Sequence, residues 1–162
     1  MPDAAVATAP VEGGAVATVR AYLALTKPNI IWLLLITTVP AMIVAEGAWP
    51  STWLVVATLV GGSLAAGGAN AINQFAERDI DALMERTRER PLPMGAIEPR
   101  NAAIFGVVLG VVAVAWLVVT VNVLSAALAV GALAFYAVVY TYYLKRRTVQ
   151  NLVIGGAAGA AP

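Results

Sequence analysis

Apolar stretches long enough to cross a lipid bilayer make up most of this sequence. A membrane-spanning helix needs about 20 consecutive, mainly apolar residues. Four segments approach that length: residues 29–45, 53–75, 102–120 and 123–144. The chain is 60% hydrophobic and only 12% charged, whereas a soluble domain carries about 25% charged residues. We therefore predict an all-α, polytopic transmembrane helical bundle, and we exclude a soluble globular domain, a disordered chain and a nucleic-acid-binding protein.

The two ends of the chain differ from these four segments. Residues 1–20 are rich in small residues with scattered charge, and we expect a flexible cytoplasmic tail that precedes a membrane domain over residues 21–162. A fifth apolar stretch, residues 152–162, ends after about ten residues, which is too short to cross a bilayer. We expect four complete spans plus the start of a fifth, and a sequence that is truncated.

The basic residues indicate how the spans are oriented. All 10 lysines and arginines fall on one side of the predicted membrane, and the opposite turns at residues 46–52 and 120–122 contain none. Cytoplasmic loops of membrane proteins are enriched in Lys and Arg. We therefore expect the N-terminus and the charged loop at residues 77–100 to lie in the cytoplasm. The basic residues are Arg20, Lys27, Arg78, Arg86, Arg88, Arg90, Arg100, Lys145, Arg146 and Arg147.

Two residue types that often carry chemistry are missing from the sequence. It contains no histidine and no cysteine. Disulfides, thiolate metal sites and imidazole ligands are therefore excluded. Any metal that this chain binds must be held by oxygen ligands.

A column of oxygen-bearing side chains follows the second apolar segment. Asn73, Glu77 and Asp81 are spaced four residues apart, so they share one face if the helix continues through them. Carboxylates at this spacing repel each other, and a divalent cation would remove that repulsion. Mg²⁺ favours a few carboxylates together with phosphate oxygens. The column predicts a Mg²⁺–diphosphate site at the cytoplasmic end of a membrane helix.

A solvated loop whose acids pair with nearby arginines is the alternative interpretation. Against it, Asn73 lies at membrane depth, where a polar residue is costly and usually functional. Asn70 lies about one turn earlier on a similar face. Asp79 lies off the column and is either a ligand of a second metal ion or a partner of Arg78 or Arg86.

The acidic column and the arginines after it form an extended motif. Asn73, Glu77 and Asp81, followed by RTRERPLP at residues 86–93, resemble the first acidic motif of the UbiA-type membrane prenyltransferases. Three further segments point to the haem-modifying branch of that family: LTKP at 25–28, TTVPAM at 37–42 and LKRRTVQNLVIGGAAGA at 144–160. The resemblance covers about residues 20–162 and corresponds to the N-terminal half of the family's bundle.

The resemblance implies an activity and its cofactor. It implies Mg²⁺-dependent transfer of a farnesyl group from farnesyl diphosphate to the vinyl group of protohaem IX, making haem O, in the bacterial plasma (inner) membrane. It also implies partners among haem A synthase and the oxidase-assembly proteins. The implied metal ligands are Asn73, Glu77, Asp81 and Asp79, the implied catalytic residues are Asp81, Glu77, Asn73 and Lys145, and the implied diphosphate-binding residues are Arg86, Arg90, Lys27 and Arg146.

Two departures from the family pattern leave alternatives open. Many members have a Tyr four residues before a Lys at the end of the fourth helix, where this chain has Thr141 before Lys145. The family's second acidic motif is absent from the sequence. A different acceptor, such as a quinone precursor or a chlorophyll-like ring, would use the same acidic face, and an inactive membrane fragment or scaffold is a further alternative. A transporter is disfavoured, because transporter sites usually lie near the membrane midplane.

Overall fold

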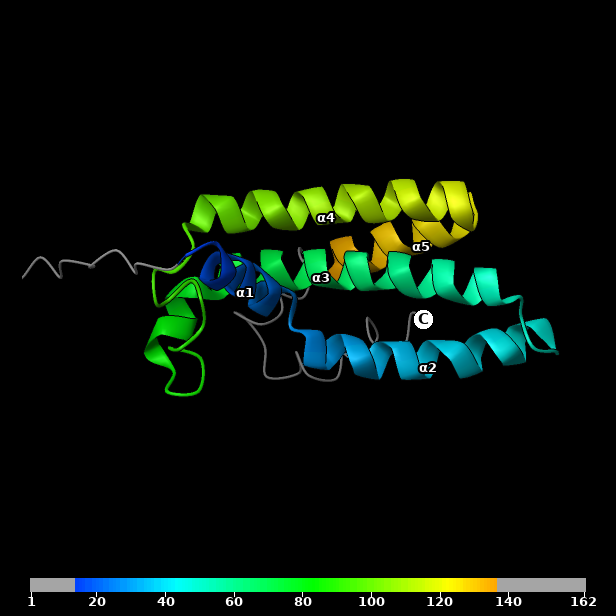
Figure 1. The fold of residues 1–162 in the computed structure, drawn as a ribbon, viewed down its shortest axis with the longest axis horizontal. Helices are drawn as coiled ribbons and strands as arrows, with labels where there is room; N and C mark the ends of the chain where they lie inside the picture. The colour runs from blue at the N-terminus through cyan, green and yellow to red at the C-terminus, as the bar shows by residue number, and fades with distance from the viewer. Residues whose placement is uncertain (1–13, 137–162) are drawn as a thin grey trace, which may run out of the picture.

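The computed structural model describes residues 14–136, and this part of the chain is helical, without strands. Figure 1 shows long helices running side by side along the molecule. The first and the last helix of the described residues are shorter and pack against them. The all-α bundle predicted from the sequence is confirmed. The helices are α1 (Ala15–Thr26), α2 (Pro28–Glu46), α3 (Thr52–Leu83), α4 (Pro99–Thr120) and α5 (Val123–Ala134).

Three of these helices, α2, α3 and α4, are long and apolar enough to cross a membrane. They contain the predicted spans at residues 29–45, 53–75 and 102–120. The fourth predicted span begins where α5 begins, at Val123, and its residues 137–144 lie outside the described residues. The partial fifth span at residues 152–162 also lies outside them.

Helix α1 begins earlier than the predicted boundary of the membrane domain. The tail was predicted to extend to residue 20, whereas the helix begins at Ala15. Its last turns pack into the bundle, because Leu25 is fully buried and the ring of Tyr22 meets that of Phe105 edge to face, with centroids 5.0 Å apart. This packing stabilises a helix whose alanines already favour helical backbone. Residues 15–20 of the predicted tail are therefore helical, and the boundary of the membrane domain stays a prediction.

The length of α3 explains how a polar site can follow a membrane span on one helix. Its 32 residues extend over about 48 Å at about 1.5 Å per residue. The hydrocarbon core of a bilayer is about 30 Å thick. The last turns of α3 therefore extend past the apolar layer. Ser51 caps the start of the helix, because its hydroxyl accepts a hydrogen bond from the Leu54 amide at 3.2 Å.

Helices α3 and α4 approach each other closely at two glycines. A Cβ atom added to Gly68 would lie 2.7 Å from the Gly106 carbonyl oxygen, and one added to Gly106 would lie 2.9 Å from the Gly68 carbonyl oxygen. Small residues permit such contact between membrane helices. This contact fixes α4 against the part of α3 that lies just before the acidic column.

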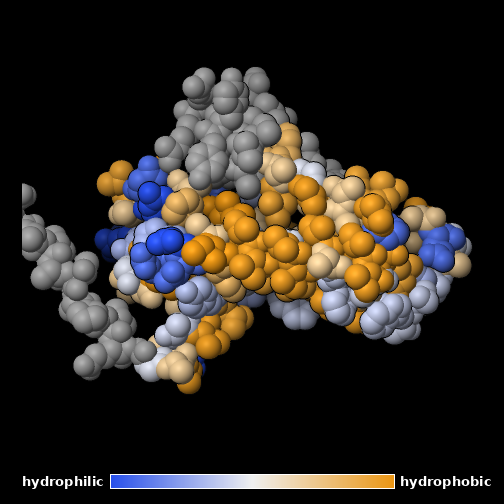
Figure 2. All heavy atoms as spheres, turned by 90° about the horizontal axis from the view of Figure 1, so that it is seen from above, coloured by the Kyte–Doolittle hydropathy of each residue, from blue (hydrophilic) through white to orange (hydrophobic). Residues whose placement is uncertain are grey.

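The surface of the bundle suits a lipid environment. No residue of α2 is buried, and large apolar side chains such as Trp32 (66% exposed) and Val119 (83% exposed) cover the outside. Figure 2 shows apolar residues across the middle of the viewed face, with hydrophilic residues gathered mostly towards its ends. An apolar surface of this extent marks contact with a membrane or another protein. The chain is therefore a multi-pass membrane protein.

The described basic residues gather at one end of the bundle. Helix α1 and the loop at residues 84–98 lie at the same end, while the turns after α2 and α4 lie at the other (Figure 1). The one-sided distribution predicted from the sequence is thus reproduced for the basic residues up to Arg100. Lys145, Arg146 and Arg147 lie outside the described residues.

Candidate active site

The predicted acidic column is intact and buried. Helix α3 continues without a break to Leu83, so Asn73, Glu77 and Asp81 lie on one face. Their exposed fractions are 2%, 4% and 4%. Burying such groups is costly unless they find partners. This face of α3 is therefore a polar site inside the bundle and is not solvated, although Asp81 does pair with a nearby arginine, as the alternative interpretation expected.

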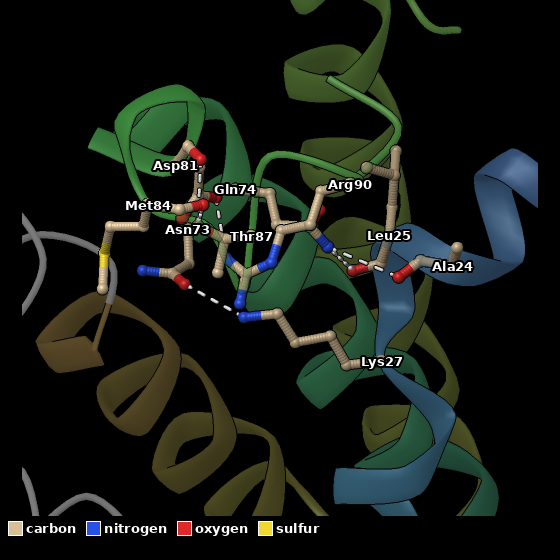
Figure 3. Close-up of polar contacts among 9 residues, drawn as sticks. All are labelled: Ala24, Leu25, Lys27, Asn73, Gln74, Asp81, Met84, Thr87 and Arg90. Carbon is tan, nitrogen blue, oxygen red and sulfur yellow. Dashed lines mark hydrogen bonds and ion pairs between the residues drawn. The ribbon is translucent and has the colours of Figure 1, made fainter. Parts of the chain in front are cut away.

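Basic side chains reach the two ends of this column (Figure 3). The Lys27 ammonium donates a hydrogen bond to the Asn73 side-chain oxygen at 3.3 Å. The Arg90 guanidinium forms an ion pair with the Asp81 carboxylate at 2.7 Å. Two cations that are far apart in the sequence thus meet one face of α3. Such an arrangement can hold an anion with several oxygens together with a cation.

Lys27 reaches the column from the junction between α1 and α2. Its backbone is left-handed, with φ 53° and ψ 63°, and it is the single non-glycine residue with positive φ between residues 14 and 136. Its N–H donates to the Ala24 carbonyl at 3.3 Å, and its carbonyl accepts from the Ile30 amide at 2.9 Å. Pro28 follows, and a proline disfavours right-handed helical backbone in the residue before it. The turn separates two helices and presents Lys27 to α3.

Arg90 reaches the column from the loop that connects α3 to α4. The buried Thr87 hydroxyl donates to the Asp81 carbonyl at 3.0 Å, and the Arg90 amide donates to the Thr87 carbonyl at 3.0 Å. Leu92 and Ile97 anchor the rest of the loop, because they are buried in the same apolar cluster as Leu25. The loop folds back on the end of α3 and holds Arg90 beside Asp81.

Other predicted site residues lie elsewhere. Asp79 and Arg86 are exposed, and Asp79 lies off the buried face. Asn70 is buried, but its side-chain amide donates to the Thr26 carbonyl at 2.9 Å and so contacts the α1 end. Lys145 and Arg146 lie outside the described residues, so their predicted roles stay predictions.

Gln74 is a buried polar residue for which no role was predicted from the sequence. Its side-chain nitrogen donates to the Leu25 carbonyl at 2.9 Å and to the Ala24 carbonyl at 3.4 Å. One signal was available in the sequence: Gln74 follows Asn70 by four residues, so the two amides share a helix face. That face is next to the acidic column and meets α1.

The oxygen donors of the column fit part of a magnesium site. Glu77 and Asp81 provide carboxylates and Asn73 an amide oxygen, which are ligands that Mg²⁺ accepts alongside phosphate oxygens and water. Within residues 14–136, no three acidic side chains are grouped closely enough to hold a metal ion by themselves. A metal bound here would need further oxygen ligands, such as those of a diphosphate.

Comparison with known proteins identifies the class to which this fold and site belong. The chain belongs to the UbiA prenyltransferase family, whose model matches residues 34–162. It is similar to the protoheme IX farnesyltransferase of Clavibacter michiganensis subsp. michiganensis, with 54% identity over 143 residues, which cover 88% of this chain and 47% of that protein. No solved structure matches the chain.

Two further relatives carry the same name. The protoheme IX farnesyltransferase of Streptomyces avermitilis is 59% identical over 146 residues, which cover 90% of this chain and 48% of the relative. That of Kineococcus radiotolerans is 59% identical over 139 residues, which cover 86% of this chain and 41% of the relative. The chain thus spans about half the length of the curated relatives it matches.

Proposed function

We propose that the full-length protein containing this chain transfers a farnesyl group from farnesyl diphosphate to a vinyl group of protohaem IX, making haem O. The main support is the similarity to relatives named protoheme IX farnesyltransferase, at 54–59% identity over most of this chain. The buried acidic column with a cation at each end supports the diphosphate half of this reaction. Its acceptor comes from the relatives' name alone.

In this proposal the column binds the diphosphate as its magnesium complex. Glu77, Asp81 and Asn73 would supply protein oxygens to Mg²⁺, which neutralises negative charge on the departing diphosphate when it is bound. Lys27 and Arg90 now contact Asn73 and Asp81. On binding, the two cations would turn to the diphosphate oxygens and leave the α3 oxygens to the metal. Lys145, Arg146 and Arg86 would add positive charge, and Asp79 would be a ligand only at a second metal ion.

The reaction is a substitution at the farnesyl carbon and an addition at the vinyl group. The allylic C–O bond of farnesyl diphosphate breaks and its electron pair leaves with the diphosphate. The vinyl π electrons of protohaem form the new C–C bond to the farnesyl carbon. Water then adds to the resulting porphyrin-side cation and loses a proton, giving the hydroxyfarnesyl side chain. Positive side chains placed where the leaving charge develops accelerate such a step.

The bundle would keep the farnesyl cation away from water until the acceptor reacts. The helices that lead to the site are apolar, and α3 and α4 are closely packed. An enclosed apolar site prevents water from consuming a reactive intermediate. We place the protein in the bacterial inner membrane with its N-terminus in the cytoplasm, by the distribution of basic residues. Haem A synthase and oxidase-assembly proteins are the proposed partners.

The test is to express the full-length gene in a host that lacks its own haem farnesyltransferase. Haem extracted from the membranes is then analysed by mass spectrometry. We expect a hydroxyfarnesyl haem with the gene and none with the empty vector. Expression without this product would reject protohaem as the acceptor, and incubation of the membranes with farnesyl diphosphate and a quinone precursor would then test the alternative acceptor.

A further inference from the structure

We propose that Asn70 and Gln74 are positioning residues that hold the α1–α2 turn against α3 and so place the Lys27 ammonium at the acidic column. The proposal concerns how Lys27 is held. Its consequence for catalysis rests on the proposed function, in which Lys27 binds the diphosphate.

The first observation is that the two amides bind the carbonyls at the end of α1. The last carbonyls of a helix have no partners within it. The Gln74 amide donates to the Leu25 and Ala24 carbonyls at 2.9 and 3.4 Å, and the Asn70 amide donates to the Thr26 carbonyl at 2.9 Å. Three successive carbonyls just before Lys27 are thus bound by side chains of α3 (Figure 3 shows the Gln74 contacts).

The second observation is that the neighbouring residue on α3 receives Lys27. Asn73 lies directly before Gln74, and its oxygen accepts the hydrogen bond from the Lys27 ammonium at 3.3 Å. One turn of α3 therefore binds both the backbone that precedes Lys27 and the tip of its side chain. The two kinds of contact fix where the turn lies and where its side chain points.

The third observation is that the Lys27 backbone is strained. A non-glycine residue with left-handed backbone needs surrounding contacts to hold it. Lys27 has φ 53°, and the side chains of Asn70 and Gln74 donate hydrogen bonds to the three carbonyls before it. Without them we expect the turn to relax and the ammonium to leave the column.

The fourth observation is that Gln74 is not optimised for stability. It is 1% exposed, and its side-chain oxygen has no hydrogen-bond partner among the described residues. A buried polar atom without a partner is destabilising. Leucine at this position would remove that unfavourable atom together with the two hydrogen bonds that the Gln74 side chain donates. Stability and Lys27 placement are therefore expected to respond differently to Gln74→Leu, which makes the role testable.

The experiment measures the exposure of Lys27 directly. The purified full-length protein, in detergent and without ligands, is labelled by reductive methylation, and the rate at Lys27 is followed by peptide mass spectrometry. The variants are Gln74→Leu and Asn70→Ala. The control is Ser63→Ala, because the Ser63 hydroxyl bonds the Leu59 carbonyl of its own helix. The thermal unfolding midpoint and the KM for farnesyl diphosphate are measured on the same samples.

We expect Lys27 of Gln74→Leu to be labelled about five- to tenfold faster than in the wild type, as the loss of two neutral hydrogen bonds would allow. Asn70→Ala should show a smaller increase, and Ser63→Ala none. The unfolding midpoint of Gln74→Leu should stay within about 3 °C of the wild type, while its KM for farnesyl diphosphate rises by a factor similar to that of labelling.

Each other outcome counts against a specific statement. Unchanged labelling in both amide variants overturns the positioning role. Loss of folded protein in both variants also overturns it, because the amides would then hold the fold and not the turn. If wild-type membranes make no farnesyl haem but the labelling differences persist, the proposed function fails and the positioning of Lys27 by Asn70 and Gln74 stands.

Discussion

The Asp81 carboxylate lies 2.7 Å from the Arg90 guanidinium, and their side chains are 5% and 26% exposed. The pair joins the last turns of α3 to the loop that follows it. The Thr87 hydroxyl reinforces this link through the Asp81 carbonyl. Asp81 therefore positions Arg90. In the proposed function Asp81 would bind the metal and Arg90 the diphosphate. Because the two proposed roles differ, substitutions at Arg90 and at Asp81 are expected to have different effects.

Arg90→Met should weaken diphosphate binding more than it weakens the fold. Methionine keeps much of the side-chain volume but removes the charge and the hydrogen bond to Asp81. Hydrogen bonds to charged groups contribute about 1.5–3 kcal/mol, so we expect the KM for farnesyl diphosphate to rise by about tenfold or more. The measurement is steady-state farnesyl transfer in membranes containing the full-length variant.

Arg88→Met is the matched control for that experiment. Arg88 lies two residues before Arg90 in the same loop and is exposed. Its replacement changes the net charge equally. Equal increases of KM in both variants would mean that the charge of the loop matters and that the contact between Arg90 and Asp81 does not.

Asp81→Ala should abolish farnesyl transfer without preventing membrane insertion. The substitution removes one of the two carboxylates of the column, while the apolar spans that direct insertion are unchanged. Glu85→Gln is the control, because Glu85 is an exposed acid just past the end of α3. Product formation is measured together with the amount of protein in the membrane fraction. Activity retained in Asp81→Ala would reject Asp81 as a metal ligand.

The helices and the acidic column could be predicted because both follow from local regularity. Apolar runs gave the spans of α2, α3 and α4 to within a few residues, apart from the continuation of α3. The four-residue spacing placed Asn73, Glu77 and Asp81 on one face once that continuation was assumed. Neither inference required knowledge of how distant segments meet.

The contacts between segments could not be predicted in the same way. Asn70 appeared to belong to the acidic face, but α1 packs beside it and its amide binds the Thr26 carbonyl. The Lys27 ammonium meets Asn73 of α3, which is 46 residues later in the sequence. Each of these features depends on tertiary packing.

Gly106→Ala should destabilise the bundle. The added Cβ would lie 2.7 Å from the Ile72 side chain and 2.9 Å from the Gly68 carbonyl oxygen, so α3 and α4 must move apart. Overpacking of this kind costs about 1–3 kcal/mol, which we expect to lower the thermal unfolding midpoint in detergent by several degrees.

Gly62→Ala provides the comparison for the Gly106 variant. Gly62 lies within α3, and a Cβ added there meets no atom within 4 Å. In a helix interior, alanine is more favourable than glycine by about 1 kcal/mol. This variant should therefore be as stable as the wild type or more stable. A drop in both variants would indicate that the α3–α4 contact is not the cause.

Removal of divalent metal should abolish farnesyl transfer. It should also change the effect of pyrophosphate on the rate at which Lys27 is methylated. The column alone has too few acidic ligands for a metal site within residues 14–136, so metal and diphosphate should bind together. We expect EDTA to stop the reaction and excess Mg²⁺ to restore it. Inorganic pyrophosphate should slow the methylation of Lys27 only when Mg²⁺ is present, because the metal holds the anion beside the ammonium. Protection by pyrophosphate in the presence of EDTA would show that Lys27 and Arg90 bind the anion without a metal, and the column would then lose its assigned role.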